Sequence, residues 1–415
     1  MRLSRKSKKE WIPYRTLAGM SPSDRCRVGV ELGLLPRLEG TTHKECGTKL
    51  ILKDMRDRSS GHTVGVLKGI ARVPKLCRYF CSSHRCGGMK HGLPVQSDED
   101  AAIQLGGRGR AAAGEGVLIV CLACQPFVQK YTSVNDIGLI SGISSFSIQV
   151  YLDEVRSQQA RLNILEQAKV KFSRGMMVEI DETAVRAERI KCSSPCASCG
   201  PDCEGYRLRW NRWIGLVQRG DRSNMVILQL PFETSLASGG GVPLSANECD
   251  DYVAQFLGKG VIVFTDGAAA YEAFAAGNIK CSDDCSREDC LARAVAAGQG
   301  KCNGWRPRQG RYRFTKFYKQ KQLSHGVVTH KKEEWAIVKS VRIHTATGNS
   351  YSVKLKHGTE CCDGCWPELK QAIPDQVSST DHERIATYVN AWAWRARHVG
   401  KDLFSMFTQS LKKLT

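Results

Sequence analysis

The sequence predicts an α/β (α+β) fold in which a mixed sheet carries acidic residues at the ends of its central strands. Residues 176–185, MMVEIDETAV, form a mostly apolar run that leads into Asp181. Residues 261–267, VIVFTDG, form a second apolar run that ends in Asp266, and a helix pattern further on carries Asp363. Short apolar runs are typical of buried central strands. A carboxylate at the end of such a strand is held rigidly beside solvent, as a metal-dependent active site requires.

Composition limits the class of protein. The chain has 415 residues, enough for two or three domains, and its hydrophobic content of 42% and charged content of 25% are typical of a globular protein. The net charge of +20 indicates a polyanionic partner, and nucleic acid fits best. No apolar run approaches the ~20 residues of a membrane span, so we expect no membrane association. The 19 cysteines follow no apolar signal segment and favour a reducing, intracellular location.

The N-terminal region, residues 1–95, is expected to combine a basic arm with a degenerate zinc-ribbon-like segment. The first fifteen residues contain six basic side chains and one acid, which is typical of a nuclear-import patch and predicts the nucleus if the host is eukaryotic. Four irregularly spaced cysteines follow: Cys46, Cys77, Cys81 and Cys86. Because this spacing is looser than that of paired CxxC knuckles, they are either zinc ligands or free buried thiols.

The next two segments are predicted to be a linker and a DNA-binding region. Residues 96–116 are rich in Gly, Ala and charge and are expected to be a linker. Residues 117–172 have a helical pattern with a turn near Gly142, which is typical of a helix-turn-helix whose second helix enters the major groove. Ser145 and Gln149 would then face DNA. A helical hairpin that packs on the next domain is the alternative.

Two cysteine-rich insertions are predicted, at residues 190–204 and 279–304. In the first, three, two and three residues separate Cys192, Cys196, Cys199 and Cys203. This spacing indicates structural zinc, and a loop with free or paired thiols is the alternative. The second insertion has a looser spacing and the same two interpretations. Between the insertions, residues 206–229 predict a β-hairpin with its turn at Gly220.

The strongest nucleic-acid-binding pattern lies in residues 305–321. This stretch contains seven basic residues, no acid and five aromatics. Cations hold phosphates and aromatic rings stack on bases, so the pattern predicts a nucleic-acid surface, with a solvated basic loop as the alternative. The basic residues concerned are Arg306, Arg308, Arg311, Arg313, Lys316, Lys319 and Lys321.

Asp363 is the third acid that the pattern favours. Residues 363–370, DGCWPELK, predict a turn that opens a helix, and this helix would return Asp363 to the strand ends. Glu360 and Glu368 are competing candidates for the same role. His325, in a strand pattern upstream, is a candidate for positioning a phosphate or a water molecule.

The predicted elements follow the order that a ribonuclease-H-like core needs. A strand with an acid comes first, then a hairpin and a helix, then a second strand with an acid, and finally further strands and a helix that carries the third acid. The sequence resembles the ISXO-like DDE transposases, bacterial insertion-sequence enzymes related to the eukaryotic Merlin elements. The motifs that carry the resemblance are VEIDET at 178–183, FTDGAAAY at 264–271, LSHG at 323–326 and DGCWPELK at 363–370. The expected transposase domain spans residues 173–400, with a C-terminal tail at 401–415.

The resemblance implies that Asp181, Asp266 and Asp363 are catalytic acids that hold two Mg²⁺ or Mn²⁺ ions. Such ions activate a water or a DNA 3′-hydroxyl, first to cleave the transposon ends and then to join them to target DNA. It also implies a homodimer, because two DNA ends must be brought together. Two features depart from the family pattern: its third acid is usually Glu, and the cysteine insertions are not part of it.

Two other classes of function remain open. A catalytically decayed or domesticated transposase would act as a zinc-containing DNA-binding protein, and the departure at Asp363 favours it. A zinc-rich RNA-binding protein would need the stretch 305–321 to form a stacking surface away from the acids.

Overall fold

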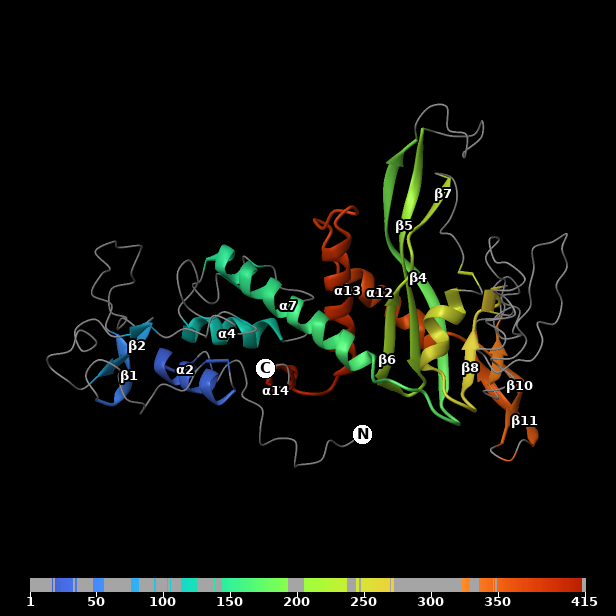
Figure 1. Cartoon of the computed structure of the whole chain (residues 1–415), viewed down its shortest axis with the longest axis horizontal. Helices are drawn as coiled ribbons and strands as arrows, with labels where there is room; N and C mark the ends of the chain where they lie inside the picture. Colours follow the sequence, from blue (N-terminus) through green and yellow to red (C-terminus); the bar gives the residue numbers. More distant parts are fainter. Residues whose placement is uncertain are drawn as a thin grey trace, which may run out of the picture. The chain divides into compact units, whose positions relative to one another are not determined.

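The structure is a computed structural model, and the chain forms two compact units, residues 1–162 with 398–415 and residues 163–397 (Figure 1). It describes residues 17, 19–32, 34–35, 48–55, 76–81, 93–94, 103, 105, 113–124, 134, 137–138, 144–192, 205–236, 244–245, 248–268, 270–271, 323–328, 336–345, 347 and 349–412.

The first unit combines a small sheet with helices. Three antiparallel strands form the sheet in the order β1 (Leu50–Met55), β2 (Leu76–Cys81) and β3 (Leu93–Pro94). The helices are α2 (Pro22–Glu31), α4 (Ala113–Ala123), most of α7 (Ser145–Gln167) and α14 (Leu403–Leu411). Helix α14 begins where Asp402 accepts hydrogen bonds from the N–H groups of Phe404 and Ser405. The predicted tail is therefore largely helical.

The helices of this unit differ in part from the predicted pattern. Helix α4 begins at Ala113, inside the expected linker, and ends at Ala123, before Pro126. The second helix of the predicted helix-turn-helix is present as α7, which is 23 residues long. Most of the segment expected to hold the first helix and the turn lies outside the described residues, so the motif stays a prediction. No described helix is both long enough and apolar enough to cross a membrane.

The second unit is built on a mixed sheet with the strand order β6-β5-β4-β8-β9, to which β7 adds by pairing with β5. The strands β4, β5 and β6 pair antiparallel, whereas β8 and β9 run parallel to β4. The predicted hairpin turn at Gly220 is present, with Gly220 at a φ of 79°. The strands are β4 (Met177–Lys191), β5 (Tyr206–Gln218), β6 (Asp221–Gln229), β7 (Glu233–Leu236), β8 (Ile262–Thr265) and β9 (Ser324–Val327).

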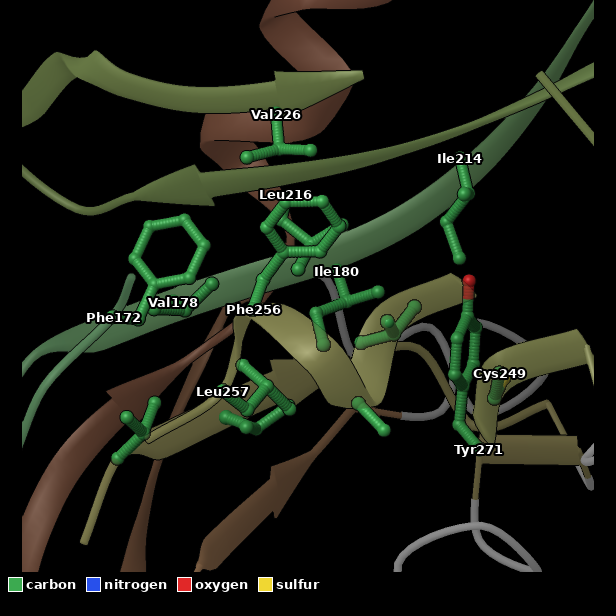
Figure 2. Packing of buried hydrophobic residues seen from close by; sticks show 14 of the residues in the cluster. Phe172, Val178, Ile180, Ile214, Leu216, Val226, Cys249, Phe256, Leu257 and Tyr271 are labelled. Atoms are coloured by element: carbon green, nitrogen blue, oxygen red, sulfur yellow. The ribbon is translucent and has the colours of Figure 1, made fainter. Parts of the chain in front are cut away.

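One face of this sheet is covered by a large apolar cluster. Alternate residues of the central strands, such as Val178 and Ile180 of β4, point into it and meet Phe256 and Leu257 (Figure 2). The covering segment consists of the π-helical turn η2 (Cys249–Val253) and the 3₁₀ turn η3 (Ala254–Phe256). The sequence predicted a helix here, and the structure has two short irregular turns.

The opposite face carries two helices and a hairpin. Helices α12 (Glu360–Gln371) and α13 (His382–Arg397) pack their apolar sides on β5 and β6. The hairpin of β10 (Ile337–His344) and β11 (Ser350–His357) packs on β8 through Val341. The predicted mixed α/β class with a mixed sheet is thus confirmed, and the sheet offers two chemically different faces at its centre.

Candidate active site

Two neighbouring parallel strands bring Asp181 and Asp266 together. In the pairing of β4 with β8, Met177 lies beside Ile262 and Glu179 beside Phe264. Continuing this register by two residues puts Asp181 beside Asp266, with both side chains on the same face because side chains alternate along a strand. Neighbouring strands lie ~4.8 Å apart, so the two carboxylates are close neighbours.

Helix α12 adds Asp363 to this face. Asp363 lies within the first turn of α12, whereas the sequence suggested a turn before the helix. Its N–H donates to the Thr359 carbonyl at 2.8 Å, and its Oδ2 accepts a hydrogen bond from Thr359 Oγ1 at 3.0 Å. The charge of Asp363 acts directly on Asp181, so the three predicted acids share one electrostatic neighbourhood.

The Asp181 carboxyl has a strongly perturbed pKa. Burial is the main cause, and the charges of Asp363 and Asp266 add to it, so the pKa rises from 3.8 to about 7. A hydrogen bond from Trp366 Nε1 to Asp181 Oδ2, at 2.6 Å, opposes the shift. The Asp181 carboxyl is buried, although Asp181 as a whole residue is partly exposed to solvent. Perturbation by burial together with like charges is common at functional sites.

Trp366 is a contact that the sequence did not reveal. In the sequence, Trp366 served only to identify the motif that begins at Asp363. In the structure, its ring packs over Gly215 of β5. A Cβ added at Gly215 would lie 2.5 Å from Trp366 Cη2, so only glycine leaves room for the ring to pack this closely on β5. The tryptophan is thereby held where its N–H meets Asp181. A glycine within a central strand, where it weakens the strand, is the signal that pointed to this close approach.

Glu179 and Arg219 fix α12 above the sheet, and neither was singled out from the sequence. Glu179 is buried, and Arg219 Nε donates to its Oε1 at 2.6 Å. The other oxygen, Oε2, accepts from the N–H groups of Cys361 and Cys362 at 2.6 and 3.2 Å, so the carboxylate caps the helix N-terminus. Arg219 also donates to the carbonyls of Lys356 and Gly358. A single Glu inside an apolar strand was the available signal, because a buried charge needs a partner.

Glu182 faces away from this group, as strand alternation predicts. It accepts a hydrogen bond from the Leu244 N–H at 3.0 Å and lies 3.5 Å from Arg212 Nη2. Arg212 is itself buried and donates to Glu248 at 2.8 Å. Burial raises the pKa of Glu182, while the Leu244 N–H and Arg212 oppose the rise. Glu182 therefore belongs to a buried ion-paired group on the other face.

The competing candidates for the third acid are both ion-paired. Glu360 lies 2.7 Å from Lys356 Nζ, and Glu368 lies 3.1 Å from Arg222 Nη2. Asp363 has no cationic partner among the residues described, and its charge is one of the main causes that raise the pKa of Asp181. The geometry therefore favours Asp363 over Glu360 and Glu368.

His325 and Tyr271 lie on the Glu182 face. His325 pairs with Val263 in the β8–β9 register, and its Nε2 lies 2.9 Å from Thr265 Oγ1. Burial, then the charge of His357, lowers the pKa of His325 to about 4. His325 is thus on the opposite face from Asp266, which argues against the phosphate-positioning role suggested by the sequence. Tyr271 is buried beside Cys249 (Figure 2), and its hydroxyl has no hydrogen-bond partner within the described part of the chain.

The carboxylates fit a hard divalent cation by their chemistry. Their oxygen atoms are the ligands that Mg²⁺ and Mn²⁺ prefer, and a cation would offset the repulsion that raises the pKa of Asp181. In the described ranges, however, no three His, Cys, Asp or Glu side chains are arranged to hold a metal ion together. The donor set suits such an ion by its chemistry.

Most of the other predicted site residues lie outside the described residues. This holds for the basic residues of the stretch 305–321 and for the thiols of both proposed zinc groups, with three exceptions. The backbones of Cys77 and Cys81 lie in β2, and Cys192 directly follows β4, where its N–H donates to the Gly205 carbonyl at 2.9 Å. Ser145 and Gln149 both lie near the start of α7, with Ser145 exposed and Gln149 partly exposed.

Comparison with known proteins adds no assignment: no family model, no curated protein and no solved structure matches this chain. The chemistry of the site therefore has to be argued from its own residues.

Proposed function

We propose that the chain is a DDE-type transposase, similar to the ISXO-like enzymes, with a ribonuclease-H-like catalytic core. It binds transposon-end DNA and catalyses metal-dependent strand cleavage and strand transfer. The observation that carries the proposal is the position of Asp181 and Asp266, level with each other on adjacent parallel strands, with the charge of Asp363 acting on the same carboxyl.

The arrangement of the second unit supports the core assignment. An antiparallel hairpin precedes two parallel strands, and a helix that carries an acid lies over the face that bears the other two acids. This is the sequence of elements that a ribonuclease-H-like core needs. The order of β4, β5, β6, β8, β9 and α12 along the chain matches it.

The residues of the site have separable roles in this proposal. Mg²⁺ or Mn²⁺ held by the acids would activate the attacking oxygen and stabilise the leaving one. Asp181 and Asp266 are the main ligands, and Asp363 completes the set from α12. Trp366 holds the Asp181 carboxyl in place through its N–H, and the Glu179–Arg219 pair sets the height of α12 above the strands.

The proposal is tested by cleavage of duplex DNA that carries the terminal repeats flanking the coding sequence. With Mg²⁺, the full chain should nick this DNA, and Asp181→Asn or Asp266→Asn should lower the rate roughly 1,000-fold, since metal ligation contributes several kcal/mol to the transition state. Asp251→Asn removes an exposed carboxylate from η2 and is the matched control, expected to cleave normally. A Mg²⁺-dependent rise in melting temperature, absent in Asp266→Asn, gives a readout independent of activity. Full cleavage by Asp266→Asn would contradict the proposal.

A catalytically decayed transposase that acts as a zinc-containing DNA-binding protein is the second candidate. One observation favours it: the short side chain of Asp363 accepts a hydrogen bond from Thr359 Oγ1 at 3.0 Å. It predicts DNA binding and bound zinc without Mg²⁺-dependent cleavage, and no effect of Mg²⁺ on the melting temperature. Metal analysis of the purified protein, performed beside the cleavage assay, separates the two candidates.

A further inference from the structure

The β10–β11 hairpin has one apolar face and one polar, exposed face. Its antiparallel register pairs Ser340 with Lys354 and Arg342 with Ser352. Because paired residues point to the same side, these four side chains share the outer face, and all four are exposed. Val338 and Lys356 extend this face toward α12. We use the name outer face for Val338, Ser340, Arg342, Ser350, Ser352, Lys354 and Lys356.

The charge on the outer face has one sign. Residues 336–358 contain four Lys or Arg and no Asp or Glu. Lys356 is neutralised by Glu360 at 2.7 Å, whereas no acid pairs with Arg342 or Lys354 in the described part of the chain. Arg342 and Lys354 are diagonal neighbours across the two strands, close enough for their like charges to repel. An anion lying on this face would relieve that repulsion.

The inner face fixes the hairpin to the part of the sheet that bears the acids. Val341 and Leu355 pack on Phe264, which precedes Asp266 by two residues and therefore shares its face. The His357 ring meets the Phe264 ring edge-on at 5.5 Å. At the end of β11, Arg219 donates to the Lys356 and Gly358 carbonyls. The outer face is thus rigidly connected to the strand that ends in Asp266.

We propose that the outer face binds the phosphate backbone of the duplex DNA that is presented to the acids. The identity of the polyanion as DNA rests on the proposed function. Arg342 and Lys354, which no described acid pairs, are diagonal neighbours about 7–8 Å apart, and this distance spans about two phosphates of one DNA strand along its axis. The hydroxyls of Ser340 and Ser352 add neutral phosphate donors of the kind common in protein–DNA contacts.

The composition of the outer face favours duplex DNA over single-stranded nucleic acid. None of the seven residues that define it is Phe, Tyr or Trp, so these residues offer no aromatic ring on which an unpaired base could stack. Cations and hydroxyls contact backbone without reading bases. The face therefore holds DNA in position and does not select its sequence.

The test measures binding of the full chain to a DNA duplex of arbitrary sequence across a range of salt concentrations. The duplex has about 30 base pairs, which is roughly three helical turns. The variant Arg342→Ala with Lys354→Ala should bind roughly tenfold or more weakly, and the slope of log affinity against log salt should fall by about 2, or about 0.9 for each lost phosphate contact. The control, Lys259→Ala with Arg384→Ala, removes the same charge from exposed positions on a turn before β8 and on α13. It should leave the slope unchanged. The charge-keeping variant Arg342→Lys with Lys354→Arg should bind like the wild type.

The outcomes separate this inference from the proposed function. If the wild type binds DNA and the hairpin variant binds equally well with an unchanged melting temperature, the outer face is not the contact, while the proposed function stands. If the hairpin variant loses binding but the wild type never cleaves DNA with Mg²⁺, the outer face stands and the enzyme assignment falls. Tighter binding to single-stranded RNA of equal length, or no duplex binding by the wild type, overturns the inference.

Discussion

Asp181 and Glu182 are adjacent carboxylates on one strand, and the structure places them in opposite environments. Asp181 lies on the α12 face, where burial and then the charges of Asp363 and Asp266 raise its pKa and the Trp366 N–H is its side-chain partner. Glu182 lies on the η2 face, where Arg212 and the Leu244 N–H stabilise its charge. Glu179, two residues before Asp181, shares its face and is nevertheless ion-paired with Arg219.

This contrast separates acids that hold the fold together from acids left available for a ligand. A buried carboxylate with a cation and backbone donors has its charge satisfied and stabilises the packing around it. A group of carboxylates without a cation is electrostatically unfavourable by itself. A protein retains such a group where an external cation completes it. Four experiments test this difference between the two kinds of acid.

The largest effect is expected from Glu179→Ala. It leaves the Arg219 guanidinium and two N–H groups of α12 without their partner, so the free energy of unfolding should fall by about 4 kcal/mol. Chemical denaturation measures the change. Glu360→Ala is the control, because the exposed Glu360–Lys356 pair contributes less than about 1 kcal/mol. Equal losses in the two variants would show that Glu179 is not what holds α12.

The second experiment compares Asp181→Asn with Glu182→Gln without metal. At pH 8 the first removes an unfavourable charge and should raise the free energy of unfolding by about 2 kcal/mol. The second should change it by less, because Arg212 and the Leu244 N–H offset part of the cost of burying the Glu182 charge. Folded Asp181 keeps a proton up to about pH 7, while the unfolded chain loses it near 3.8, so wild-type stability should fall as the pH rises across this window. Asp181→Asn should abolish that slope. Equal changes in stability in the two variants would refute the contrast.

The third experiment moves Trp366 without touching an acid. Gly215→Ala puts a methyl group 2.5 Å from the Trp366 ring and should destabilise the fold by about 2 kcal/mol through overpacking. The displaced Trp366 ring can then no longer donate to Asp181. The rate of Mg²⁺-dependent cleavage should therefore fall by more than the loss of folded protein accounts for. In Gly364→Ala, on α12 itself, the added methyl group meets nothing within 4 Å, and better helix propensity should stabilise the fold by about 0.5 kcal/mol. Thermal melts and cleavage rates of the two variants decide the matter.

The smallest effect concerns His325 on the Glu182 face. Folded His325 titrates at about 4, below its ordinary 6.5, so the unfolded chain binds a proton that the folded chain lacks between these values. Its contribution to stability is complete above pH 6.5 and is lost as the pH falls toward 4. His325→Gln should remove about 1 kcal/mol of this dependence, less than the full shift would give because the ring keeps some contact with water. An unchanged pH profile would mean that folding does not lower the pKa of His325.

Local patterns in the sequence were sufficient to predict several elements of the second unit. The apolar runs before Asp181 and Asp266 are present as β4 and β8, and the turn at Gly220 joins a hairpin. These features depend on side-chain alternation and turn conformation, which act over a few residues. The same alternation along β4 puts Glu182 on the opposite face from Asp181. The helix at Asp363 was also expected, although its first residue, Glu360, precedes the expected start.

Contacts between distant segments decided the rest. The register of β4 against β8 sets Asp181 level with Asp266, and the partner of Glu179 lies 40 residues away at Arg219. The division of the chain also differs from the predicted one, because residues 398–415 join the N-terminal unit.

From the sequence alone, the strands themselves and the face that each side chain takes could be predicted, because these properties follow from neighbouring residues. The sequence placed Asp181 at the end of its strand, whereas β4 continues beyond it to Lys191 and stays paired with β5. Only the tertiary structure decided which acids meet, which are neutralised by a cation and which face the hairpin β10–β11 covers. Those outcomes depend on strand register and helix docking, which are fixed by burial and charge pairing between segments far apart in the chain.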